Sequence, residues 1–124
     1  MPYPDDRKYT KDHEWVRLSG DLAEVGITDY AQQQLGDVVY MELPAVGSRV
    51  IAGQSFGSIE SVKAVSELFA PVGGEVVEVN GAVKDHPETI NKDPHSLWII
   101  KVRVSDPGET AALLDGSQYQ GLLG

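Results

Sequence analysis

The chain of 124 residues contains no cysteine, which excludes disulfide bonds, thiolate nucleophiles and cysteine metal sites. It also has no stretch near the roughly 18 consecutive apolar residues that a membrane-spanning helix requires. Basic residues are few, 10 against 19 acidic ones, and the formal net charge is −9. Such a surface repels phosphate backbones and anionic lipids, so we expect neither nucleic acid nor a membrane as partner.

The remaining composition, 41% hydrophobic and 23% charged, is that of an ordinary globular protein. A chain of this length is expected to form one domain, residues 1–124, with a single core. We expect it to act as a monomer. The first eight residues carry no apolar stretch that resembles a signal peptide. The expected location is therefore the cytoplasm of a bacterium, or the mitochondrial matrix if a transit peptide has been removed.

Short β-favouring segments alternate with glycine, proline and aspartate, which predicts a mostly β fold, a sandwich or a barrel. The expected strands are residues 13–18, 22–27, 37–43, 55–60, 65–70, 75–79 and 97–104. Thr28 or Asp29 is expected to cap a short internal helix that runs to Leu35 and stops at Gly36.

The remaining segments have weaker signals. Asn80-Gly81 indicates a turn, and residues 85–94 are expected to form a loop with about one helical turn. Pro107 is expected near the first position of a C-terminal helix, with an apolar face formed by Ala111, Leu113 and Leu114. Gly116-Ser117 is expected to interrupt this helix before a second turn over 118–123.

Residues 53–57 match G-x-S-x-G, the motif that presents the nucleophile of serine hydrolases. The motif functions between a strand and a helix, whereas the segment after Ser55 has the pattern of a strand. Asp85 or Asp93 with His95 would complete a triad in the hydrolase order, but nothing in the sequence brings them together. A serine hydrolase that uses Ser55 is a distant alternative.

The three histidines are also poor candidates for chemistry. His13, His86 and His95 lack the i, i+4 spacing that places two metal ligands on one helix face. We therefore expect no metal site. The sequence also lacks the glycine-rich loops that bind nucleotide phosphates.

Lys63 lies between Val62 and Ala64, at the expected turn between the strands 55–60 and 65–70. Most exposed lysines at turns are only solvated charges. A lysine that forms a Schiff base requires a desolvated pocket, which a hairpin tip does not provide. A tip does provide reach, because a group attached to its amine can swing between active sites at a high effective concentration.

Four blocks of the sequence resemble the glycine cleavage H proteins, and they lie at the separations expected for that family. They are YTKDHEWV at 9–16, VGITDYAQ at 25–32 with LGD at 35–37, ESVKAVSE at 60–67 and APVGGEVVEVN at 70–80. The resemblance covers roughly residues 7–120. It implies a barrel-sandwich hybrid of two antiparallel sheets, with a short internal helix, a C-terminal helix and the modified lysine at a hairpin tip.

The resemblance implies a non-catalytic lipoyl carrier with lipoate attached covalently to Lys63. Such a carrier takes the aminomethyl group of glycine from a pyridoxal-phosphate glycine decarboxylase (P protein) to a tetrahydrofolate-dependent aminomethyltransferase (T protein). A dihydrolipoamide dehydrogenase (L protein) then reoxidises the arm. An alternative that the sequence does not separate is an H-like relay that supplies lipoate to 2-oxoacid dehydrogenases. A biotinyl domain would have methionines in place of Val62 and Ala64.

The resemblance also implies roles for residues near Lys63. Glu60 and Gly74 match positions that lipoylating enzymes are expected to recognise. His13, Glu14 and Glu67 are expected near a cleft that shelters the loaded arm, where a carboxylate would hold a protonated amine. The alternative for Glu14 and Glu67 is simple surface solvation. The chain departs from the family at 95–97, where an aromatic residue and glycines are usual.

Overall fold

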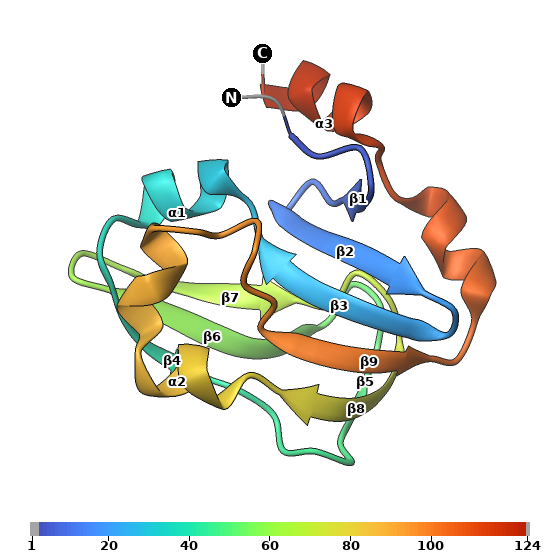
Figure 1. Cartoon of the computed structure of the whole chain (residues 1–124), viewed down its shortest axis with the longest axis horizontal. Coiled ribbons are helices and arrows are strands. Elements are labelled where there is room, and N and C mark those ends of the chain that lie inside the picture. The colour runs from blue at the N-terminus through green and yellow to red at the C-terminus, as the bar shows by residue number, and fades with distance from the viewer. Residues whose placement is uncertain (1–2, 124) are drawn as a thin grey trace.

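Two antiparallel sheets form the computed structural model, which describes residues 3–123 (Figure 1). The larger sheet has the strand order β1-β2-β3-β9-β8-β5, and the smaller has the order β4-β6-β7. The strands are β1 (Lys8–Tyr9), β2 (Glu14–Ser19), β3 (Leu22–Ile27), β4 (Val38–Glu42), β5 (Arg49–Val50), β6 (Ser55–Ser61), β7 (Val65–Phe69), β8 (Gly74–Val79) and β9 (Ile100–Val104). The predicted mostly β fold of two antiparallel sheets is confirmed.

Short helices connect and cover the sheets. They are α1 (Asp29–Leu35), α2 (Gly81–Asp85), α3 (Gly116–Leu123) and the 3-10 helices η1 (Pro87–Asn91) and η2 (Pro107–Ala112). The prediction for α1 is confirmed, because the Thr28 hydroxyl accepts a hydrogen bond from the Ala31 N–H and Gly36 follows the last turn at φ 77°.

Two predictions for the segment between β8 and β9 are wrong in detail. Asn80 does not form a turn with Gly81 but caps α2, because its side chain accepts a hydrogen bond from the Val83 N–H. The predicted strand over 97–104 begins only at Ile100, since the Trp98 carbonyl accepts a hydrogen bond from the Asn80 side chain at 2.7 Å. Residues 85–94 are also more helical than expected, because η1 follows directly on α2.

The C-terminal helix lies further along the chain than predicted. Residues 107–112 form a 3-10 helix, and Leu114 then pairs with Tyr9 in an isolated β-bridge that ends it. The helix α3 starts at Gly116, where an interruption was expected, because Asp115 and Gln118 cap it reciprocally at 2.8 and 2.9 Å.

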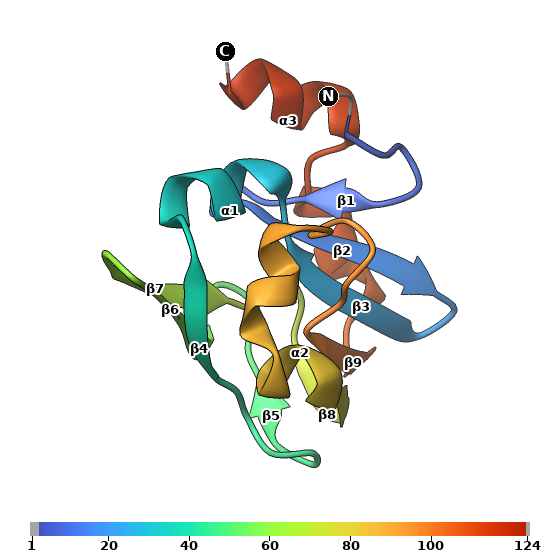
Figure 2. The ribbon, with the colours of Figure 1, turned by 60° about the vertical axis from the view of Figure 1, so that its left-hand side comes forward.

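The core lies between the two sheets. Buried side chains of the larger sheet, among them Val25, Val76 and Val102, pack in one cluster with Met41, Ile59 and Leu68 of the smaller sheet. A second cluster of Tyr9, Trp15 and Tyr119 fixes α3 against β1 and β2. The segment before β1 and the helix α3 therefore lie on the same side of the molecule (Figures 1 and 2).

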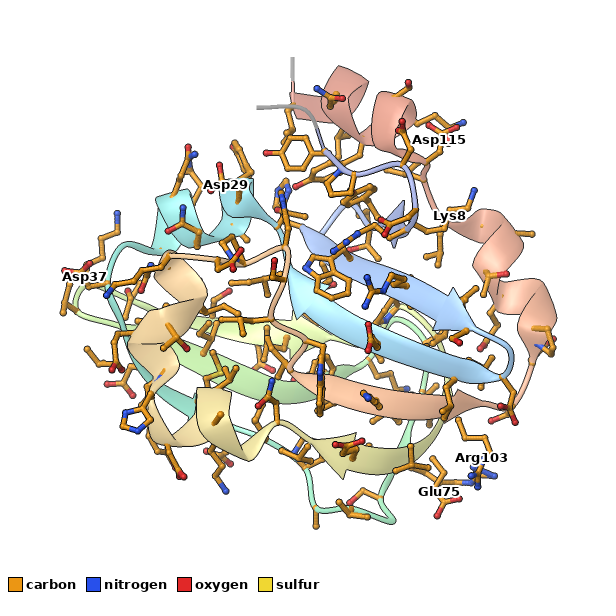
Figure 3. The ribbon with its side chains drawn as sticks, in the orientation of Figure 1. Lys8, Asp29, Asp37, Glu75, Arg103 and Asp115 are labelled. Carbon is orange, nitrogen blue, oxygen red and sulfur yellow. The ribbon has the colours of Figure 1, made fainter. Side chains whose placement is uncertain are left out.

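The outward face of the larger sheet carries rows of alternating charge. Arg17, Glu24, Lys101 and Glu78 occupy paired positions on four neighbouring strands, at distances of 2.6, 3.8 and 3.6 Å. Arg103 lies beside Glu75 in a second row (Figure 3). Such exposed pairs contribute little stability individually. These ion pairs nevertheless involve most of the basic residues on the larger sheet, namely Arg17, Lys101 and Arg103.

Gly74, which begins β8, has a packing reason to be glycine. A Cβ atom on it would lie 2.0 Å from the carbonyl oxygen of Arg103 on the neighbouring strand. That oxygen belongs to the backbone of a central strand and cannot move aside at little cost. Any larger residue at position 74 therefore strains the larger sheet.

We predict that Gly74→Ala lowers the free energy of unfolding by about 1–3 kcal/mol or more. The matched control is Gly121→Ala at an exposed position of α3, where a Cβ has no neighbour within 4 Å. The control should raise the stability by about 0.5–1 kcal/mol, because alanine favours helix. Urea unfolding measures both, and equal stabilities of the two variants would contradict the packing explanation.

Candidate functional site

Lys63 is exposed at the end of the β6–β7 hairpin, in a turn that comprises residues 62–64, here called the Lys63 turn. The hairpin projects from the body of the molecule beside α1 and β4 (Figures 1 and 2). Within β4, β6, β7 and the Lys63 turn, Lys63 is the single basic residue, against the acidic Glu42, Glu60 and Glu67.

The backbone of the Lys63 turn is held by the buried side chain of Ser61. Its hydroxyl accepts hydrogen bonds from the N–H groups of Lys63, at 3.3 Å, and Ala64, at 3.1 Å. The Val62 N–H donates to the carbonyl of Asp37, at 3.0 Å, outside the hairpin. The turn is therefore fixed to the body while the lysine side chain remains accessible. The sequence reasoning missed Ser61, although a serine that opens a turn is a recognisable signal.

The lysine side chain leans toward the end of α1. A Cβ atom on Gly36 would lie 3.4 Å from Cε of Lys63. The aliphatic part of Lys63 therefore passes over the one residue at this end of α1 that has no side chain.

A cleft of about 320 Å³ lies beside the turn, between α1 and β7, and is called the α1–β7 cleft here. Its lining is mostly apolar and comprises Asp12, His13, Glu14, Ile27, Ala31, Gln34, Leu35, Ile59, Ala64, Val65, Ser66, Glu67 and Leu68. The structure thus brings His13, Glu14 and Glu67 together at one cleft that also includes Ala64, the neighbour of Lys63. A volume of this size lies at the lower end of the range for small-molecule sites.

Glu14 is buried, so surface solvation is the wrong explanation for this residue. Its carboxyl accepts hydrogen bonds from the Thr10 hydroxyl at 3.0 Å and the Phe69 N–H at 3.2 Å. Burial nevertheless dominates and raises the pKa of Glu14 to about 8. Glu67 is exposed instead, and its carboxylate accepts a hydrogen bond from the Ser55 hydroxyl.

His13 has the left-handed backbone φ of 68°, which is uncommon for a residue other than glycine. Its Nδ1 lies 2.7 Å from the hydroxyl of the fully buried Tyr119, which lies 2.8 Å from Oγ1 of Thr28. Burial lowers the pKa of His13, which favours the neutral ring at this hydrogen bond. Tyr119 thus links α3 to a wall of the α1–β7 cleft, a role that no local sequence pattern indicated.

The two positions expected to be recognised by lipoylating enzymes lie far apart. Glu60 is exposed on the outward face of the smaller sheet, paired with Tyr40 and Val65. Gly74 is buried in the larger sheet, and its neighbour Glu75 lies on the opposite side of the molecule from Asp37, which contacts the Lys63 turn (Figure 3). The recognition role of both residues stays a prediction.

The structure contradicts the serine hydrolase alternative. Ser55 begins β6 and is followed by strand, not helix, and its hydroxyl donates to Glu67. The His95 Nε2 instead accepts a hydrogen bond from the Asp29 N–H at 3.0 Å, at the start of α1. Within residues 3–123, no three histidine or acidic residues are grouped so as to hold a metal ion. No helix in this range is long and apolar enough to cross a membrane.

An exposed amine on a fixed turn beside a mostly apolar cleft is the arrangement expected of a carrier protein. Comparison with known proteins identifies the family. The family model described as "Glycine cleavage H-protein" matches residues 7–124. The chain belongs to the glycine cleavage H-protein family.

Individual members of the family match this chain over nearly its whole length and theirs. The glycine cleavage system H protein of Anaeromyxobacter sp. (strain K) is 55% identical, over 99% of this chain and 97% of its own. The H protein of Geobacillus kaustophilus is 52% identical, over 99% of this chain and 98% of its own. The crystal structure of an H protein from Mycobacterium marinum has a TM-score of 0.88 and 44% identity, over 96% of this chain and 97% of that one.

The chain is accordingly a non-catalytic lipoyl carrier of the glycine cleavage system. Membership in the family implies a lipoyl-lysine. It also implies the decarboxylase, the aminomethyltransferase and the dehydrogenase of that system as partners.

We predict that Glu14 makes the stability of the protein depend on pH. The native state keeps a proton on Glu14 up to about pH 8, whereas the unfolded chain loses it near the ordinary value of 4.5. The native state therefore binds more protons between these values, and its stability falls as the pH rises from about 4.5 to about 8. The slope is at most about 1.4 kcal/mol per pH unit.

Urea unfolding between pH 5 and pH 9 tests this dependence. Glu14→Gln should flatten the part of the curve below pH 8, while the control Glu67→Gln, at an exposed cleft residue, should leave it as in the wild type. Parallel curves for the wild type and Glu14→Gln would show that Glu14 does not carry the dependence.

Proposed function

We propose that Lys63 is the lipoyl attachment residue, through which the chain carries the aminomethyl group of glycine between the three enzymes of the system. The observation that carries the proposal is the exposed lysine on a fixed turn, which is the single basic residue of its sheet. The lipoyl group supplies a long arm that ends in a disulfide, which no side chain of this cysteine-free protein provides.

The residues around Lys63 fit such an arm. The α1–β7 cleft begins at Ala64, beside the lysine, and its apolar lining by Ala31, Leu35 and Val65 excludes water from a chain of methylene groups. Glu14 lies in the same cleft and keeps its proton at neutral pH. A cationic group in the cleft would favour the ionised form of Glu14, and a charge-assisted hydrogen bond would then hold it.

The surroundings of Lys63 also support docking of enzymes. Glu60, Glu42 and Glu67 give the hairpin side an acidic character, while several of the basic side chains pair with acids on the larger sheet. Basic patches on lipoylating enzymes and on the three partner enzymes would be attracted to this side. Glu60, on this side, is proposed as one residue that the lipoylating enzymes recognise. Gly74, in the larger sheet, is proposed as a second.

We further propose that the chain acts as a monomeric single domain in the bacterial cytoplasm. Bacterial relatives that match over nearly their whole length support the single domain and the bacterial setting. The alternative use, relay of lipoate to 2-oxoacid dehydrogenases, requires the same arm on Lys63, and no contact within residues 3–123 favours it.

We predict a lipoyl mass increment on Lys63 when the chain is isolated from cells that make lipoate. Lys63→Arg should lose the increment and abolish glycine cleavage in an assay reconstituted with the three enzymes. The stability should change by less than about 0.5 kcal/mol, because the side chain is exposed. Peptide mapping and thermal unfolding provide the two measurements.

Lys84→Arg is the matched control, since Lys84 is an exposed lysine on α2, away from the hairpin. It should keep both the lipoyl group and the activity. Finding Lys63 unmodified in such cells, or full activity in Lys63→Arg, would refute the attachment site.

A further inference from the structure

The side chain of Asn91, at the end of η1, makes three hydrogen bonds, two of them to the backbone of residues 36–38. Its Nδ2 donates to the Gly36 carbonyl at 2.8 Å and to Oε1 of Gln32 at 3.1 Å. Its Oδ1 accepts from the Val38 N–H at 2.8 Å. Both hydrogens of the amide and its oxygen therefore have partners, and all three partners lie in α1 or directly after it.

Segment 36–38 lies between the end of α1 and the irregular start of β4. Gly36 has a positive φ of 77°, and the pairing of β4 with β6 is irregular between Val38 and Tyr40. The backbone groups that Asn91 binds are thus groups that the helix and the sheet leave free. In Figures 1 and 2, η1, directly after α2, lies alongside both α1 and β4.

The same segment holds the Lys63 turn. The Asp37 carbonyl accepts the hydrogen bond from the Val62 N–H at 3.0 Å, and Val38 pairs with Ser61 at the end of β6. Gly36 lies beneath the Lys63 side chain. Segment 36–38 therefore connects the Asn91 side chain directly to the Lys63 turn.

Segment 36–38 also joins α1, which lines the α1–β7 cleft, to β4, which pairs with the hairpin. We infer that Asn91 is a positioning residue for Lys63: it fixes the orientation of the Lys63 turn relative to α1 and thereby presents the amine to the lipoylating enzyme. The inference rests on the proposed attachment site. Asn91 itself does not touch the reacting atoms.

Loss of these hydrogen bonds would let the turn sample several orientations, of which only a fraction fits the enzyme. The apparent affinity for the enzyme falls by that fraction, whereas a turn already bound reacts as before. A defect in positioning therefore raises KM for the chain in lipoylation and leaves kcat nearly unchanged. A general loss of folding would also raise the apparent KM, because it lowers the concentration of competent chain. The comparison is therefore made where the variants are folded, and it includes a local readout at the Lys63 turn.

The test compares Asn91→Asp with Asn80→Asp. Asn91→Asp keeps the size of the side chain and the acceptor for Val38 but loses both donor hydrogens. Asn80 is a matched control, because it is also half-buried and its amide also donates to a backbone carbonyl, that of Trp98. Its partners Val83 and Trp98 belong to α2 and the approach to β9, apart from segment 36–38.

Two readouts are measured at a temperature where both variants are folded. The first is hydrogen exchange of the Val62 N–H in the unmodified chain, and the second is kcat and KM for lipoylation by a lipoate ligase supplied with lipoate and ATP. We expect Asn91→Asp to speed the exchange and to raise KM by about 5- to 30-fold, with kcat within about twofold. We expect Asn80→Asp to change neither.

Unchanged Val62 exchange and unchanged KM in Asn91→Asp would overturn the inference, and so would equal effects in both variants at equal stability. A wild-type chain that the ligase does not modify at Lys63 would overturn the proposed function itself, which distinguishes the two failures. If Asn91→Asp unfolds, Asn91→Ala removes the amide without adding charge and gives the same comparison.

Discussion

The hydrogen bond from the Val62 N–H to the Asp37 carbonyl connects the exposed end of the hairpin to the rest of the protein. A carrier lysine has to be accessible to several enzymes, yet an isolated hairpin is only marginally stable in water. The fold resolves this conflict because the Ser61 side chain closes the turn from within and segment 36–38 holds it from outside. Asn91 binds the backbone of that segment on both sides of Asp37, which orders the turn before an enzyme binds.

Electrostatics divides the molecule into two sides. On the larger sheet, cross-strand rows such as Arg17, Glu24 and Lys101 neutralise one another. The smaller sheet and the Lys63 turn carry Glu42, Glu60 and Glu67 against a single lysine, so this side has a net negative charge. Inside the α1–β7 cleft, burial raises the pKa of Glu14 to about 8, so this carboxyl is neutral at pH 7.

The aromatic cluster under α3 connects the far end of the chain to the cleft. The Tyr119 ring stacks on Tyr9 with 4.9 Å between their centroids, and its hydroxyl bridges His13 and Thr28. His13 lines the cleft and Thr28 caps α1, so one buried hydroxyl restrains two of its walls. This arrangement gives the C-terminal helix a role in shaping the site although it lies outside the two sheets.

Features that depend on local chemistry could be predicted from the sequence. The Thr28 cap, the alternation in β8 and the tip at Lys63 follow from side chains that act on their own neighbours. The other features could not, because they depend on partners that are distant in the chain. The Arg103 carbonyl dictates glycine at position 74, burial sets the protonation of Glu14, and segment 36–38 gives Asn91 its partners. The two-residue strands β1 and β5 are too short to show a sequence pattern. They form because they pair with the longer strands β2 and β8.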